Sequence, residues 1–244
     1  DTDISPYDSG SYASSTTYVT GKAVEQACEK LKNNLCDLAL QTFHCEKEDV
    51  EFTSQGVKNL KTNELLTLKE LALKAMCGNN IETQVTVTHS SPVSPPPYMV
   101  GMVEIELDKE TGQVDILDYV AVVDCGTVIN PKLARVQVEG GVVQAIGMAL
   151  YEDIRYSNNG RLETNNLMTY KIPTRQDIGE LHVDFVESYE PTGGFGAKSI
   201  GEVVINTASP AIQHAIKNAV GADIRTLPMT PEKVFMAMDE KYKV

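Results

Sequence analysis

The sequence predicts an α+β fold, and three observations lead to this prediction. Helical periodicity is confined to a few separate stretches, and one long stretch alternates like a β-hairpin. The two patterns do not alternate regularly, as they would in a doubly wound parallel sheet. At 244 residues and 42% hydrophobic composition, the chain is long enough for one sizeable core or two small ones.

The N-terminal third should begin with an irregular loop, because the first 20 residues are rich in Ser, Thr, Tyr and Gly. An amphipathic helix should follow, since apolar side chains recur at helical spacing from Val24 to Leu38. A second, shorter helix is predicted over residues 66–76, closed by Gly78 just past its end. The proline-rich stretch 91–98 cannot continue a helix or lie in a central strand, so we expect a connector.

The middle of the chain is expected to contain the hairpin and a buried helix. Over residues 99–124, Val103, Ile105 and Leu107 alternate with acidic residues, and the sequence DKETG supplies the turn. Residues 135–150 are apolar almost all round, which predicts a helix buried on most sides. A further strand is expected at 182–187.

Two helices should follow near the C-terminus. Ser209 is the expected N-cap of the first, with Pro210 in its first turn, and Gly221 should end it. Thr230 and Pro231 repeat the device for a short final helix.

Composition excludes several classes of partner. A net charge of −13 argues against nucleic acid, whose phosphates would repel the chain. Apolar runs stay well short of the roughly 20 residues of a membrane-spanning helix, and the N-terminus has no signal-peptide pattern. The five cysteines form no CxxC pair, so neither a zinc site nor an iron–sulfur site is indicated. An odd number of cysteines without a disulfide framework favours a reducing cytoplasm over an oxidising compartment. We therefore predict a cytoplasmic protein without a metal site of its own.

The first candidate site is a loop of small hydroxyl-bearing side chains at residues 12–19. Backbone N–H groups and Ser/Thr oxygens in such a loop can close on an anionic or heterocyclic ligand. Taken alone, the composition favours an ordinary Ser/Thr loop.

The second candidate is Gln144, which lies in the apolar helix at 139–150. A buried amide must find hydrogen-bond partners or cost about 1–3 kcal/mol. Gly140, Gly141 and Gly147 each weaken the helix by roughly 1 kcal/mol relative to Ala, which makes sense if a backbone or cofactor approaches closely. Tight packing, with Gln144 bonded to a nearby main chain, explains the pattern equally well.

The third candidate is Glu202, which follows a glycine-rich stretch and precedes the apolar residues 203–205. A carboxylate desolvated by such neighbours has a raised pKa, the condition for a general base near neutrality. The alternative is a glutamate at a helix N-terminus, where the dipole stabilises it by about 0.3–1 kcal/mol. The glycines match neither the Walker A motif nor the dinucleotide fingerprint.

Four segments, in this order, resemble the molybdenum hydroxylases of the xanthine dehydrogenase and aldehyde oxidase family, in the C-terminal part of the molybdenum-binding subunit. They are SGSYASSTTYVTGKAVEQAC, VDCGTVINPKLARVQVEGGVVQAIGMALYED, GGFGAKSIGEV and ADIRTLPMTPEKV. The resemblance implies that residues 1–244 form the molybdopterin-binding domain of a larger subunit or of a split-subunit enzyme.

The resemblance also implies a cofactor, a molybdenum–pyranopterin in its simple or dinucleotide form. The positions that match cofactor-binding residues of the family are Ala13, Ser14, Ser15, Thr16, Gln144, Lys198 and Gly201. Glu202 matches the glutamate that deprotonates the hydroxide on molybdenum, which then attacks an electrophilic carbon of the substrate. Val203 stands where the family commonly has proline, a residue that fixes the backbone but does no chemistry.

Further expectations concern substrate and partners. The substrate should be an N-heterocycle such as a purine, with an aldehyde as the nearest alternative and a noncatalytic scaffold as another. Several family segments have no counterpart in this chain: the Gln-Phe-Gly stretch, the substrate-orienting arginine and a second glycine-rich pterin loop. We therefore expect the N-terminal part of the molybdenum-binding region as a partner, with iron–sulfur clusters and FAD on partner domains or chains.

Overall fold

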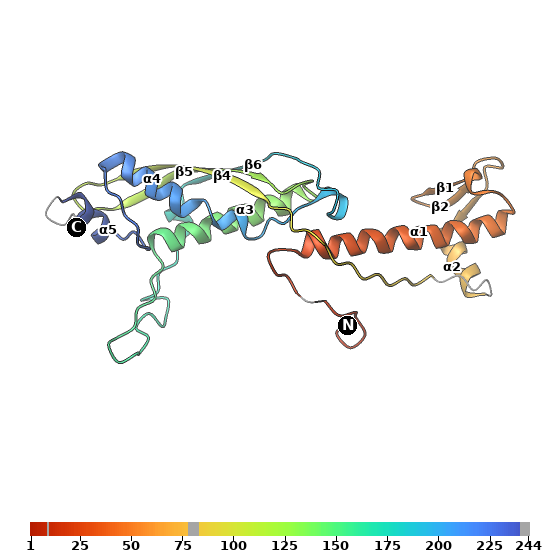
Figure 1. The fold of residues 1–244 in the computed structure, drawn as a ribbon, viewed down its shortest axis with the longest axis horizontal. Coiled ribbons are helices and arrows are strands. Elements are labelled where there is room, and N and C mark those ends of the chain that lie inside the picture. Colours follow the sequence, from red (N-terminus) through yellow and green to blue (C-terminus); the bar gives the residue numbers. More distant parts are fainter. Residues whose placement is uncertain (9, 78–82, 240–244) are drawn as a thin grey trace. The chain divides into compact units, whose positions relative to one another are not determined.

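The computed structural model describes residues 1–8, 10–77 and 83–239 (Figure 1). The chain divides into two compact units. The smaller unit comprises Tyr18–Val93 and Thr192–Phe195, and the larger unit comprises Asp1–Thr17, Ser94–Pro191 and Gly196–Val244. Each unit has its own hydrophobic core, which is the two-core alternative that the chain length allows.

The smaller unit is built on the long helix α1 (Gly21–Phe43), which the helical periodicity predicted. Three short antiparallel strands, β1 (Val50–Thr53), β2 (Gly56–Asn59) and β3 (Leu65–Thr67), form a sheet in that order. This sheet was not expected from the sequence. Its core consists of four buried side chains, Leu38, Ala39, Val57 and Leu71.

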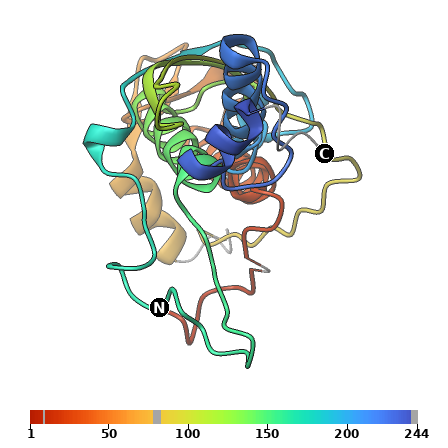
Figure 2. The ribbon, with the colours of Figure 1, turned by 90° about the vertical axis from the view of Figure 1, so that its left-hand side faces the viewer.

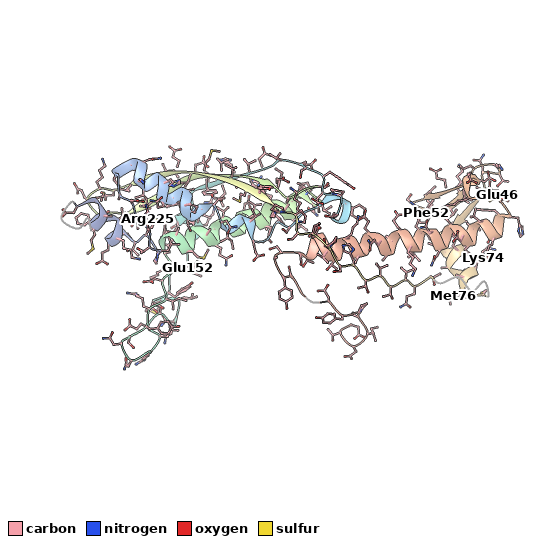
Figure 3. All side chains as sticks on the ribbon, in the orientation of Figure 1. Glu46, Phe52, Lys74, Met76, Glu152 and Arg225 are labelled. Carbon is pink, nitrogen blue, oxygen red and sulfur yellow. The ribbon has the colours of Figure 1, made fainter. Side chains whose placement is uncertain are left out.

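Helix α2 (Leu68–Met76) follows β3 directly and confirms the second predicted helix. Its start is set by Thr67, whose side chain accepts a hydrogen bond from the backbone N–H of Glu70 while the Glu70 carboxylate accepts one from Thr67. Gly78, expected to close this helix, lies outside the described residues. Phe52, labelled in Figure 3, belongs to β1 of the sheet in this unit. The Lys32 ammonium lies 5.9 Å from the centroid of its ring.

The larger unit contains a three-stranded sheet in the order β4-β5-β6. Strands β4 (Tyr98–Leu107) and β5 (Val114–Asp124) form the predicted antiparallel hairpin, with a register shift between Glu104 and Ile105. Strand β6 (Glu180–Phe185), predicted as a strand, pairs parallel with β5. Parallel neighbours need a long crossover connection, and here a helix provides part of it.

That helix is α3 (Pro131–Leu150), which packs with α4 (Ala208–Val220) against one face of the sheet (Figures 1 and 2). The core lies between this face and the two helices. Helix α5 (Pro231–Met238) packs against the same core through Val234. The N-cap of α5 is Thr230, as predicted, whereas α4 begins at Ala208, so the predicted N-cap Ser209 lies inside its first turn. Gly221 ends α4 as expected.

The expectation that α3 is buried on most sides is wrong for one stripe of its surface. Eight of its residues are buried, but a stripe along the helix is exposed to solvent, comprising Leu133, Val136, Gln137, Gly140, Gln144 and Met148. The apolar composition therefore marks two surfaces, of which the core of the larger unit covers only one. Among the described residues, no helix is both long and apolar enough to cross a membrane.

Candidate active site

The N-terminal loop and the glycine-rich segment meet at one hydrogen bond in the larger unit. The Oγ atom of Ser14 donates to Oε2 of Glu202 at 3.0 Å, although 188 positions separate the two residues. The loop reaches this position through a left-handed backbone at Ala13 and Ser14, with φ angles of 48° and 56°. Non-glycine residues rarely adopt this region, and such outliers cluster at ligand-binding and active sites.

The missing side chain of Gly201 allows the loop to come this close. A Cβ atom at this position would lie 2.6 Å from Oγ of Ser14 and 3.0 Å from its Cβ. The Nε2 atom of Gln137, on α3, lies 4.0 Å from the same point. Ser14, Gly201 and Gln137 therefore surround one small region beside the Glu202 carboxylate.

Gln137 was not singled out in the sequence. A signal was available, because Gln137 lies seven residues before Gln144 and so on the same face of the helix, two turns away. The apolar context drew attention to Gln144, yet Gln144 is exposed and lies about 10 Å further along the helix axis than Gln137. The expected burial of Gln144 is wrong.

Glu202 itself sits just before a short 3₁₀ turn, Val203–Ile205. Val204 is fully buried, and a Cβ on Gly141 of α3 would overlap its Cγ2 atom. This close approach explains one of the three helix glycines, whereas a Cβ on Gly140 would meet open space. The turn after Glu202 is thus seated directly against α3.

The apolar neighbours of Glu202 do not desolvate it. Val204 turns into the core, whereas the Glu202 side chain is exposed in this chain. The expectation that this carboxylate is buried is therefore wrong. Side chains adjacent in sequence point in different directions along a turn, so a buried Val204 does not bury Glu202.

The other loop residues contribute in different ways. The backbone N–H of Ser15 donates to the Tyr12 carbonyl at 3.0 Å and closes a turn, and Thr16 begins a π-helical turn, Thr16–Thr20. Within the described part of the chain, neither side chain hydrogen-bonds to Glu202.

Lys198 is held by an ion pair. Its Nζ atom lies 2.8 Å from Oδ2 of Asp124, and 5.4 Å from the ring centroid of Tyr98. The Lys198 side chain is only 11% exposed. Burial acts to raise the pKa of the Asp124 carboxyl, but hydrogen bonds from Lys198, Gly126 and Ser188 outweigh it, so this pKa is lowered.

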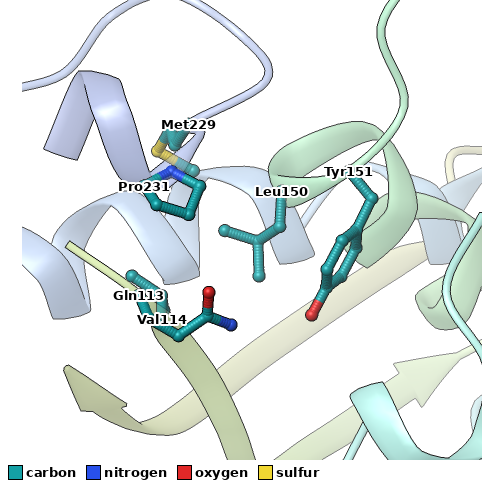
Figure 4. A pocket seen from close by; sticks show the side chains of 6 residues that line it. All are labelled: Gln113, Val114, Leu150, Tyr151, Met229 and Pro231. Atoms are coloured by element: carbon teal, nitrogen blue, oxygen red, sulfur yellow. The ribbon is translucent and has the colours of Figure 1, made fainter. Parts of the chain in front are cut away.

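A small cavity of about 170 Å³ lies elsewhere, at the C-terminal end of α3 (Figure 4). It is lined by Gln113, Val114, Leu150, Tyr151, Met229 and Pro231. Burial, reinforced by the charges of Asp177 and Asp115, raises the pKa of Tyr151 to about 12, so the phenol stays neutral. Leu150 is 13 residues, or roughly 20 Å, from Gln137 along the helix, so this cavity is separate from Glu202.

Comparison with known proteins identifies the family of this chain. Residues 1–179 match the family described as the molybdopterin cofactor-binding domain. The chain belongs to this family. The matched region of this molybdopterin-binding chain includes Ser14 and α3 and ends before Glu202.

Relatives of this molybdopterin-binding chain extend the match to nearly its whole length. It is 34% identical over 245 residues to the probable hypoxanthine oxidase XdhD of Escherichia coli strain K12, covering 98% of the chain and 25% of that protein. Its fold superposes on the Cu,Mo-CO dehydrogenase with a TM-score of 0.86 and 26% identity, covering 97% of this chain and 31% of that one. Quinoline 2-oxidoreductase from Pseudomonas putida 86 gives the same TM-score and identity, with coverages of 98% and 32%.

These matches confirm the predicted fold class, the α+β molybdopterin-binding domain. The chain spans about a quarter to a third of the length of these relatives.

The residues at the site fit the family's cofactor. The Ser14 hydroxyl and the exposed Gln137 amide are neutral hydrogen-bonding groups, suited to a heterocycle rich in polar nitrogen and oxygen atoms. Gly201 adds no bulk between them. In the described ranges, no group of three or more His, Cys, Asp or Glu side chains could hold a metal ion directly.

Proposed function

We propose that this chain is a component of a molybdenum hydroxylase and that Glu202 is its general base. The hydrogen bond between Ser14 and Glu202 carries the proposal, because it joins a carboxylate to the loop that resembles the family's cofactor loop. A general base must lie within hydrogen-bonding reach of the proton that it removes, so a carboxylate beside the cofactor loop is well placed.

The chain's own residues divide the work as follows. Ser14 holds Oε2 of Glu202, which fixes the orientation of the carboxylate and leaves Oε1 to accept a proton. The cofactor, when bound, supplies Lewis acidity that makes a water-derived oxygen acidic, together with a place for the substrate's electrons. Cofactor-binding roles for Ala13, Ser14, Ser15, Thr16 and Gly201 are part of the proposal.

Two predicted cofactor residues need a modified role. Gln137 is better placed than Gln144 to reach a ligand beside Gly201. Lys198 is paired with Asp124, so its ammonium is already neutralised within the chain.

The substrate that we propose is an N-heterocycle such as a purine. Hypoxanthine and quinoline, which appear in the names of two of the relatives, are both N-heterocycles. The CO dehydrogenase shares the same fold, so the fold alone does not select the substrate. An aldehyde is the second candidate, favoured by the resemblance to aldehyde oxidases.

Partners are also part of the proposal. The site in this chain is open, with Glu202 and Gln137 both exposed, and a hydroxylase site must exclude bulk water. We propose that the N-terminal part of the molybdenum-binding region covers this site and the exposed stripe of α3. Iron–sulfur and FAD domains or subunits would then remove the electrons, and the assembly would be cytoplasmic.

The test is Glu202→Gln in the complete assembled enzyme, with Glu104→Gln on the exposed face of β4 as the matched control. We expect turnover to fall by about 10²–10⁴-fold, the usual contribution of general base catalysis, while molybdenum and pterin contents stay unchanged. Near-normal turnover would instead support a noncatalytic scaffold. Assays with hypoxanthine, quinoline and an aldehyde distinguish the two substrate classes.

A further inference from the structure

The segment that carries Glu202 is anchored on both sides. On its C-terminal side, Val204 is fully buried against Gly141 of α3. On its N-terminal side, Lys198 is attached to the end of β5. Glu202 lies between these anchors, among the five residues 199–203, which include Gly201.

The N-terminal anchor consists of several contacts in the larger unit. The backbone N–H of Lys198 donates to the Cys125 carbonyl at 2.7 Å, and Ala197 forms an antiparallel bridge with Gly126. The Lys198 side chain returns to the same place, where its Nζ atom lies 2.8 Å from Oδ2 of Asp124. Main chain and side chain of one residue therefore hold the segment to one strand end.

Asp124 collects donors from three parts of the chain. Its Oδ2 atom accepts the hydrogen bond from Lys198. Its Oδ1 atom accepts hydrogen bonds from the Gly126 backbone N–H at 2.9 Å and from Oγ of Ser188 at 2.7 Å. Asp124 is the last residue of β5, and Ser188 follows the parallel strand β6. The carboxylate thus ties together two neighbouring strand ends and the glycine-rich segment.

We infer that Asp124 and Lys198 form a positioning pair that sets the location of Glu202. This inference rests on the proposed role of Glu202 as a base. Without the pair, the segment keeps its backbone contacts at Ala197 and Lys198 and its anchor at Val204, but the Lys198 end is held less firmly. The backbone freedom of Gly201 then allows the carboxylate between the anchors to shift against its exposed hydrogen bond from Ser14. A misplacement of about 1 Å at a reacting group costs on the order of 100-fold in rate.

The inference gives Lys198 a role different from cofactor binding. Its ammonium lies against a carboxylate and over the Tyr98 ring, so it is compensated before any ligand arrives. A cofactor phosphate would have to compete with Asp124 for it. The two roles predict different results when Lys198 or Asp124 is changed.

The test compares Asp124→Asn, Lys198→Met and the double variant in the assembled enzyme, with Asp223→Asn as the control. Asp223 pairs with Arg225, whose side chain is 82% exposed. Figure 3 labels Arg225. We expect kcat per bound molybdenum to fall about 10- to 100-fold in both single variants, with KM changed less than about twofold. The double variant should be no worse than either single one, because both remove the same interaction.

Three further readouts separate positioning from general damage. Lys198→Arg should recover most of kcat, since it restores the ion pair. Hydrogen exchange of residues 196–206 should be faster in Asp124→Asn, at unchanged molybdenum and pterin content. If Asp124→Asn does not assemble, Ser188→Ala removes one donor only and should lower kcat by a smaller factor.

Two results would overturn the inference. Loss of pterin in Lys198→Met with full retention in Asp124→Asn would assign Lys198 to the cofactor. Unchanged kcat in all variants, beside an inactive Glu202→Gln enzyme, would show that the base works without this pair. Failure of the proposed function is distinct, because Glu202→Gln would then remain active whatever the positioning variants do.

Discussion

Gly141 and Val204 pack so closely that a Cβ on the glycine would overlap Cγ2 of the valine and lie 3.0 Å from its Cβ. This contact seats the turn after Glu202 against α3. A Cβ on Gly140, the residue before Gly141, would meet open space. Helix α3 therefore contains two adjacent glycines, one without room for a side chain and one with room for it.

We predict opposite effects of alanine at these two glycines. Gly141→Ala should lower the free energy of unfolding by about 1–3 kcal/mol, because it overpacks a buried contact. Gly140→Ala should raise it by roughly 0.5–1 kcal/mol through helix propensity. Denaturant unfolding of both variants measures the difference, and Val204→Ala should relieve the strain in Gly141→Ala. Equal effects at the two positions would contradict the packing.

Removal of the Ser14 hydroxyl should weaken the orientation of Glu202. The hydrogen bond is exposed, so we expect a loss of about 1 kcal/mol of transition-state stabilisation, or about fivefold in kcat. The measurement is turnover of Ser14→Ala per bound molybdenum, with Ser11→Ala in the same loop as control. An unchanged rate per molybdenum would show that this contact does not assist the base.

A methyl group at Gly201 should push the loop away from Glu202. Its Cβ would lie 2.6 Å from Oγ of Ser14, so the loop or the segment must move. We expect Gly201→Ala to lower kcat per molybdenum more than Ser14→Ala does. Ser14→Gly in the same chain removes the clash and should restore stability without restoring the lost hydrogen bond. A Gly201→Ala enzyme with wild-type turnover would argue against the close approach.

The lowered pKa of the Asp124 carboxyl predicts that part of the free energy of unfolding depends on pH in the acid range. Its pKa in the folded chain is lowered from the ordinary value of 3.8, so its stabilising contribution is present above the unfolded pKa and is lost as pH falls through the folded one. The difference in unfolding free energy between wild type and Asp124→Asn should therefore be constant from about pH 5 to 7 and shrink below about pH 4, where the carboxyl of the unfolded chain takes up its proton. Denaturant titrations across this range measure it. A difference that grows on acidification would reverse the sign and refute the assignment.

Much of the local structure could be predicted from the sequence. The apolar spacing from Val24 to Leu38 predicted α1, and the alternation in residues 99–124 predicted the β4–β5 hairpin. Thr230 and Gly221 bound their helices where the capping rules place them. These features depend on neighbours within a few residues, which a linear pattern records.

Local patterns thus predicted most of the elements, though not the β1-β2-β3 sheet, and the family resemblance implied that the hydroxyl-bearing loop and Glu202 share one site. The folded structure was needed to show that Gln144 and Glu202 are exposed and that Gln137 lies near Gly201. It also decided that Lys198 faces Asp124, 74 positions away, and that β6 runs parallel to β5. Periodicity states which side of an element is apolar, but the partner that covers that side is chosen by packing among segments distant in the chain.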